Sequence, residues 1–146
     1  MTKEIYFDLD GTIANLYGVD GWLNDLINES TRPYEIAEPL VNLSALARIL
    51  NRLQKEGYKI GVISWLSRNS TESYDEAVTI AKKNWLKKHL PSVVWNEIKI
   101  VKYGYYKEVA CNYSKGILFD DEENNRKYWS GTAYDVDNII GVLKSL

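Results

Sequence analysis

Short apolar runs that each end in an acidic or hydroxyl residue recur along this chain, and they constrain its fold more than any other feature. Residues 4–8 read EIYFD, residues 59–64 read KIGVIS, and residues 116–120 read GILFD. Each run is long enough for one buried strand and too short for a helix. The sequence therefore predicts buried strands that carry polar side chains where they end.

Helical patterns separate these runs. Apolar residues recur at spacings of three and four from Leu43 to Leu53 and stop at Gly57, which predicts an amphipathic helix. A capping box at Ser73 and Glu76 predicts the start of a second helix that ends before Pro91. Further elements complete the pattern: strands over 97–101 and near 132–134, a short helix capped by Asp20, and helices over 108–113 and 136–146.

This alternation of strands and helices indicates βα units. The fold class is therefore α/β, with a mostly parallel sheet of about five strands covered by helices on both faces. The length of 146 residues suits a single domain over 1–146. Residues 13–42 form an insert before the second strand, with room for one or two short helices.

Composition excludes several kinds of site. The chain has 20 acidic and 18 basic residues, and its formal net charge is −2. Cys111 is the only cysteine and His89 the only histidine, which excludes an internal disulfide, a thiolate zinc site and a His-rich metal site. No apolar run approaches the roughly 20 residues of a membrane span, and the N-terminus enters a strand pattern without a signal peptide. We therefore expect a cytoplasmic protein with no membrane partner.

Four carboxylates follow two of the predicted strands. Asp8 and Asp10 come at the end of the first run, and Asp120 and Asp121 at the end of the run over 116–120. The carboxyl ends of parallel strands lie along one edge of a sheet, where these groups would repel one another unless a divalent cation neutralised them. Oxygen ligands suit Mg²⁺, and Mg²⁺ takes phosphate oxygens as further ligands. The sequence thus predicts a magnesium site and a small phosphorylated substrate.

The order of these residues resembles the four motifs of the haloacid-dehalogenase-like (HAD) phosphatases. Segment 8–12 (DLDGT) follows an apolar strand, Ser64 follows the second strand, a lysine stands ahead of a later helix, and segment 120–121 follows another strand. The resemblance implies a Rossmann-like, three-layer α/β/α fold with a small helical cap over 13–42. It also implies Mg²⁺-dependent hydrolysis of phosphomonoesters through an aspartyl-phosphate.

The resemblance assigns roles to the acidic residues. Asp8 would be the nucleophile that attacks phosphorus. Asp10 would protonate the leaving oxygen and later activate water. Asp8, the backbone carbonyl of Asp10 and one or both of Asp120 and Asp121 would hold Mg²⁺.

The resemblance also assigns residues that contact the substrate or stabilise charge. Gly11 would permit a tight turn, and Thr12 and Ser64 would donate hydrogen bonds to phosphoryl oxygens. We choose Lys107 over Lys102 as the lysine that offsets transition-state charge, because Lys107 precedes the helical stretch over 108–113. The other lysines of 82–107 are interpreted as a solvated face.

The substrate is expected to be a nucleoside monophosphate. Residues 11–17 (GTIANLY) resemble the 5′(3′)-deoxyribonucleotidase branch of the family, and Tyr17 and Trp65 are expected to contact the substrate. An open site leaves a polynucleotide or phosphopeptide phosphatase as an alternative, although nucleic acid is not the expected partner. A non-catalytic binding protein of the same fold is a further alternative. The order of the motifs argues against a phospho-receiver domain, which carries its phosphate on a lone Asp after a middle strand.

Overall fold

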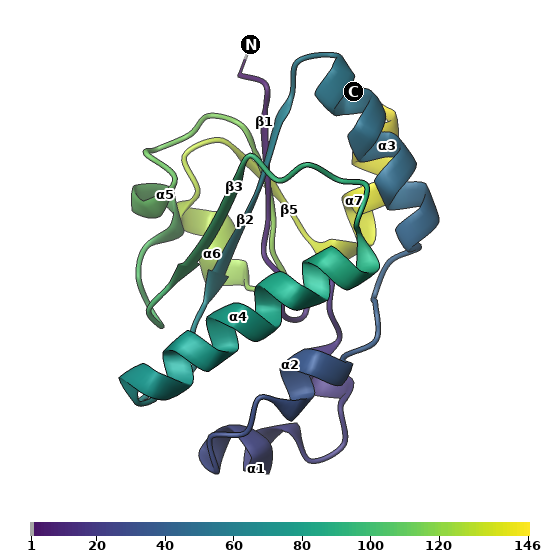
Figure 1. Ribbon diagram of the computed structural model, residues 1–146. Helices are drawn as coiled ribbons and strands as arrows, with labels where there is room; N and C mark the ends of the chain where they lie inside the picture. Colours follow the sequence, from purple (N-terminus) through teal and green to yellow (C-terminus); the bar gives the residue numbers. More distant parts are fainter. Residues whose placement is uncertain (1) are drawn as a thin grey trace.

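Five parallel strands form the centre of the computed structural model, which describes residues 2–146 (Figure 1). The strands lie in the order β3-β2-β1-β4-β5. This order places the first and fourth strands side by side, with Phe7 opposite Phe119. The predicted strands are confirmed: β1 (Glu4–Phe7), β2 (Lys59–Trp65), β3 (Glu97–Val101), β4 (Ile117–Phe119) and β5 (Thr132–Tyr134).

Helices cover both faces of the sheet. On one face, α3 (Leu43–Lys55), α4 (Glu72–His89) and α7 (Ile139–Lys144) share a core with Ile5 and Phe7 of β1. On the other face, Tyr6 of β1 packs with residues next to α5 (Lys107–Ala110) and α6 (Glu123–Tyr128). The alternation of side chains along β1 therefore supplies both cores, and the expected three-layer Rossmann-like fold is confirmed.

The two long helices follow the predicted apolar pattern, but one of them begins earlier. In α3, the side chain of Asn42 accepts a hydrogen bond from the amide of Ala45 at 3.0 Å and caps the helix. In α4, Thr71 accepts from the amide of Tyr74 at 3.2 Å, so Thr71 is the cap and the predicted capping box at Ser73 is wrong. Thr71 takes this position because its backbone is extended where the helix begins.

The insert over residues 13–42 lies beyond the carboxyl ends of the strands (Figure 1). It contains a 3₁₀ turn η1 (Leu16–Gly18) and two short helices, α1 (Trp22–Ile27) and α2 (Arg32–Ile36). Gly21 rather than Asp20 occupies the N-cap of α1, so the predicted cap is wrong. The two short helices agree with the expected room for one or two, although the location of α2 was not predicted; Pro33 lies in its first turn, where proline is tolerated.

Helix α6 was also absent from the sequence prediction. Its six residues include no buried side chain, so the sequence has no apolar stripe that would predict this helix. Trp129, which follows α6, donates from Nε1 to the carbonyl oxygen of Gly116 at 3.1 Å. This bond ties the end of α6 to the start of β4.

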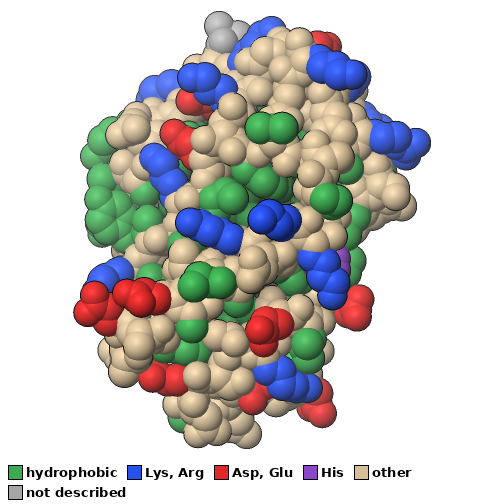
Figure 2. Space-filling model, in the orientation of Figure 1, with side chains coloured by type: hydrophobic (Ala, Val, Ile, Leu, Met, Phe, Trp, Pro, Cys, Tyr) green, Lys and Arg blue, Asp and Glu red, His purple; other side chains and the backbone are tan. Residues whose placement is uncertain are grey.

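Most of the lysines over 82–107 follow the interpretation as a solvated face, but Lys82 and Lys107 are buried. On the face drawn in Figure 2, basic side chains are scattered among hydrophobic and neutral ones, with acidic side chains gathered below them. This face therefore presents no continuous basic stripe. Among the described residues, no helix is long and apolar enough to cross a membrane.

Close packing around Gly116 generates a stability prediction. A Cβ at Gly116 would overlap the carbonyl oxygen of Glu4, whereas a Cβ at exposed Gly141 in α7 would meet nothing within 4 Å. We expect Gly116→Ala to lower the free energy of unfolding by more than about 1 kcal/mol. The matched change Gly141→Ala should raise it by about 0.5–1 kcal/mol, because alanine favours a helix over glycine. Urea denaturation of both variants measures the difference, and equal effects would contradict the packing argument.

Candidate active site

A cavity of about 310 Å³ opens at the carboxyl edge of the sheet, between the strand ends and the insert. Three predicted strand ends and one helix start contribute polar groups to its lining: Asp8, Asp10, Ser64, Lys107, Asp120 and Asp121. Residues 8 and 120 follow neighbouring strands, and the amide of Asp8 donates to the carbonyl oxygen of Phe119 at 2.9 Å. The parallel register thus brings together groups that lie more than a hundred residues apart in the sequence.

Three carboxylates gather at the floor of this cavity. Asp8, Asp120 and Asp121 each offer one oxygen, and these oxygens lie within 4.8 Å of one another. Asp8 and Asp120 are buried, and Asp121 is partly exposed. Such a group of hard oxygen ligands could hold a Mg²⁺-sized cation.

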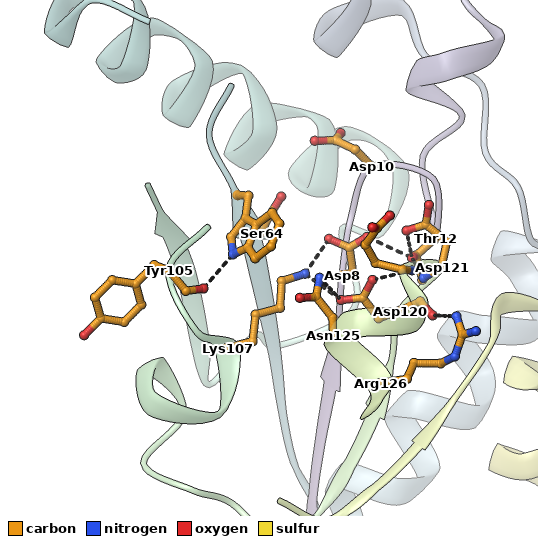
Figure 3. A network of polar contacts seen from close by, with 12 residues as sticks. Asp8, Asp10, Thr12, Ser64, Tyr105, Lys107, Asp120, Asp121, Asn125 and Arg126 are labelled. Carbon is orange, nitrogen blue, oxygen red and sulfur yellow. Dashed lines mark hydrogen bonds and ion pairs between the residues drawn. The ribbon is translucent and has the colours of Figure 1, made fainter. Parts of the chain in front are cut away.

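Lys107 stands between two of these carboxylates (Figure 3). Its Nζ lies 2.9 Å from Oδ1 of Asp8 and 2.7 Å from Oδ2 of Asp120, and the side chain is 2% exposed. Burial alone would lower the pKa of Lys107, but the two carboxylates outweigh burial and raise it, so the ammonium stays charged. Lys102 is exposed, so the structure brings only the preferred lysine into the site.

The acidic pair after β4 is held by α6. Asn125 donates from Nδ2 to Oδ2 of Asp120 at 3.2 Å, and Arg126 donates from Nη1 to its backbone oxygen at 2.9 Å. Burial first, and then the charge of Asp8, raise the pKa of Asp120. Burial also raises the pKa of Asp121, with a further contribution from its contact with Asp8. These two carboxylates therefore hold protons more strongly than free aspartates do.

Gly11 and Thr12 shape the loop that carries Asp8. Gly11 has φ of +81°, and a side chain there would overlap the carboxylate of Asp121. The hydroxyl of Thr12 lies 3.0 Å from Oδ2 of Asp8 and 3.2 Å from Oδ1 of Asp121, and it accepts from the amide of Asp121. Thr12 is fully buried, so it holds the carboxylates together, in contrast to the expectation that it faces phosphoryl oxygens.

Asp10 lies apart from the group of three carboxylates (Figure 3). Its Oδ2 forms an ion pair with Nζ of Lys82 in α4 at 2.8 Å. Burial raises the pKa of Asp10, and the charge of Lys82 opposes that rise. Its carboxylate is therefore not among the clustered metal ligands of the described residues, and its backbone carbonyl is the atom left for that task.

Lys82 is a site residue that the sequence analysis missed. It was grouped with solvated lysines, yet its side chain is only 1% exposed. A signal was present, because residue 82 falls on the buried face of α4 that also carries Val78, Ala81 and Trp85. A lysine at an apolar position of a helix indicates a buried partner.

Aromatic pairs flank the cavity on two sides. Tyr17 and Trp22 of the insert meet edge to face, with ring centroids 4.9 Å apart. The ring centroids of Trp65, the last residue of β2, and Tyr103 lie 5.1 Å apart, and Nε1 of Trp65 donates to the carbonyl oxygen of Tyr105. The expected substrate-contacting residues Tyr17 and Trp65 both line the cavity.

This sheet and its helices form a Rossmann-like α/β fold. The chain is similar to two solved structures. One is the D,D-heptose 1,7-bisphosphate phosphatase from Burkholderia thailandensis, with 15% identity, a TM-score of 0.54 and coverage of 89% of this chain and 75% of that chain. The other is the enzyme of the same name from B. bronchiseptica, complexed with magnesium and phosphate, with 14% identity, a TM-score of 0.55 and coverage of 90% and 78%. No protein-family model and no curated protein sequence matches the chain. At these identities the likeness concerns the fold.

The raised pKa values predict how stability depends on pH. A carboxyl group with a raised pKa binds its proton more tightly in the folded state, so its stabilising contribution is lost as pH rises above the ordinary aspartate pKa of about 3.9. In the presence of a chelator, we expect the melting temperature to fall more between about pH 5.5 and about pH 8.5 for the wild type than for Asp121→Asn, which lacks this group.

Thermal melts of both proteins test this pH dependence. His89, whose pKa is lowered by burial, acts in the opposite direction but is common to both proteins and cancels in the comparison. Mg²⁺ should reduce the pH dependence of the wild type, because the cation competes with protons for the same oxygens. Parallel pH profiles for the two proteins would contradict the prediction.

Proposed function

We propose that this chain is a Mg²⁺-dependent phosphomonoester hydrolase that acts through an aspartyl-phosphate on Asp8. The observation that carries the proposal is the group of Asp8, Asp120 and Asp121 at the cavity floor, with the ammonium of Lys107 bonded to two of its three carboxylates. The fold likeness to a phosphatase solved with magnesium and phosphate supports it. We assign the activity to a single domain over 1–146, with the insert over 13–42 as a small cap.

The donor set fits Mg²⁺. Asp8, Asp120, Asp121 and the backbone carbonyl of Asp10 would hold the ion through oxygen atoms. Four carboxylates and the two buried ammonium groups of Lys82 and Lys107 leave two negative charges, which one divalent cation neutralises. When bound, the cation supplies charge neutralisation that lets a phosphate dianion approach an acidic site.

The proposed reaction then proceeds in two steps, which use Asp8, Asp10, Lys107 and Ser64. A carboxylate oxygen of Asp8 attacks phosphorus, and the bond from phosphorus to the leaving oxygen breaks. Asp10 gives its proton to that oxygen, and the alcohol departs. Asp10 then takes a proton from water, which attacks phosphorus, breaks the bond to Asp8 and releases inorganic phosphate. Lys107 and Ser64 stabilise the charge on the phosphoryl oxygens.

The substrate is a small phosphomonoester, and a nucleoside monophosphate suits the cavity best. A volume of about 310 Å³ is at the lower end for ligand pockets. The Tyr17–Trp22 and Trp65–Tyr103 pairs offer flat apolar surfaces on which a base can stack. A polynucleotide or phosphopeptide is the less favoured substrate, because a cavity of about 310 Å³ suits a small molecule better. A non-catalytic binding role would leave the paired catalytic groups without a use.

The first functional test measures phosphate release from p-nitrophenyl phosphate with and without Mg²⁺. We expect Mg²⁺-dependent turnover that a chelator abolishes and that Asp8→Asn lowers by about three orders of magnitude or more, because the nucleophile is lost. Asp137→Asn removes an exposed carboxylate outside the cavity and should leave turnover unchanged. Full activity in Asp8→Asn, or turnover without any divalent cation, would reject the mechanism.

The substrate class is tested by a panel of nucleoside monophosphates, sugar phosphates and oligonucleotides with terminal phosphate. We expect Tyr17→Ala to raise KM for a nucleoside monophosphate about tenfold, the equivalent of one lost stacking contact, and to leave KM for glycerol 2-phosphate unchanged. Tyr113→Ala, at an exposed tyrosine outside the cavity, is the matched control. Hydrolysis of oligonucleotides alone would favour the polynucleotide alternative, and equal changes in KM for both substrates would refute base stacking on Tyr17.

A further inference from the structure

Lys82 is a buried cation whose hydrogen bonds are all used within the site. Its Nζ lies 2.8 Å from Oδ2 of Asp10, 2.8 Å from Oγ of Ser64 and 2.6 Å from the carbonyl oxygen of Trp65. An ammonium group has three hydrogens, so these three acceptors account for every one of them. The side chain is only 1% exposed.

The three acceptors come from two strand ends, and the lysine comes from a helix that packs over them. Asp10 belongs to the loop after β1, Ser64 and Trp65 end β2, and Lys82 lies in the middle of α4. A buried charge is costly unless several partners satisfy it, and an apolar side chain at this position of α4 would avoid that cost. Packing alone therefore does not explain why this position of α4 carries a lysine.

We propose that Lys82 is a positioning residue, which orients the Asp10 carboxylate toward the leaving-group oxygen of the substrate and the Ser64 hydroxyl toward its phosphoryl oxygens. The inference rests on the proposed function. An ammonium group only donates, so Oγ of Ser64 accepts from Lys82 and keeps its own hydrogen to donate into the cavity that it lines. Oδ2 of Asp10 is held by the ion pair, which leaves Oδ1 for proton transfer.

Lys82 also keeps the carboxylate of Asp10 away from the cation site. Asp10 is two residues from Asp8, and its carboxylate is attracted to any cation held by Asp8, Asp120 and Asp121. The ion pair with Lys82 holds that carboxylate on the α4 side of the cavity, apart from the other three (Figure 3). Lys107 thus forms its ion pairs with carboxylates of the cation site, and Lys82 forms its ion pair with Asp10, the proton-transfer group.

The test compares two substrates that differ in their need for proton transfer. The leaving group of p-nitrophenyl phosphate departs without a proton, whereas the alkoxide of glycerol 2-phosphate must be protonated. We expect Lys82→Met to lower kcat/KM for glycerol 2-phosphate by about 10²-fold or more, and kcat/KM for p-nitrophenyl phosphate by less than about 10-fold. The ratio kcat/KM covers the steps up to departure of the leaving group, so it leaves out the later attack of water, in which Asp10 serves both substrates alike. Lys83→Met, at the exposed neighbour in α4, should change neither value.

The pair Asp10→Asn and Asp10→Asn/Lys82→Met tests whether Lys82 acts through Asp10. The second variant removes both buried charges, so it remains measurable if Lys82→Met alone fails to fold. With glycerol 2-phosphate, we expect the double variant to be within about 3-fold of Asp10→Asn, because the Asp10 carboxylate is already absent and only the smaller effect through Ser64 is left to lose. A further loss of about 10-fold or more in the double variant would overturn the inference.

The outcomes separate this inference from the proposed function. If the wild type releases no phosphate from either substrate with Mg²⁺, the proposed function and the inference both fail. If the wild type is active and folded Lys82→Met loses kcat/KM equally on both substrates, the hydrolase assignment stands and the positioning role is overturned. A selective loss with glycerol 2-phosphate supports the positioning role, because a general loosening of the fold would affect both substrates alike.

Discussion

Repulsion between carboxylates at one edge of the sheet is the constraint on which the rest of this site depends. β1 and β4 are neighbours in a parallel register, so Asp8 and Asp120 must lie close together once the sheet forms. Lys107 bonds to both, and its positive charge offsets the repulsion between the two carboxylates before any cation binds. Asn125 and Arg126 of α6 and the hydroxyl of Thr12 complete the support of the acidic residues.

The same constraint explains why the four carboxylates are not equivalent. Asp8, Asp120 and Asp121 converge, whereas Asp10 is drawn aside to α4 by a second buried lysine. Convergence suits cation binding, and separation suits proton transfer, because a metal-bound carboxylate is a poor acid or base. The insert over 13–42 closes the opposite side of the cavity with Tyr17, Trp22 and Tyr34. In the proposed function, the chemistry and the selection of substrate would thus come from opposite walls.

Prediction succeeded where the sequence pattern depended on local spacing. The strands ending near Asp8, Ser64 and Asp120 were predicted because buried parallel strands are continuous apolar runs. Helix α6 was missed because its short sequence has no buried face, and short helices were expected in the insert without the location of α2. Gly11 was placed correctly in a tight turn, but the contact of its loop with Asp121 depends on a strand more than a hundred residues away.

The sequence by itself determined the α/β class, the strand ends and the acidic, histidine-free character of the site, because periodicity and residue type are local properties of a chain. Only the tertiary structure decided how the charges pair. Helical spacing could have marked Lys82 as buried, yet only the packing of α4 against the sheet shows that its partner is Asp10. The partner of a buried charge is set by which elements meet in space, and no spacing along the chain encodes that meeting directly.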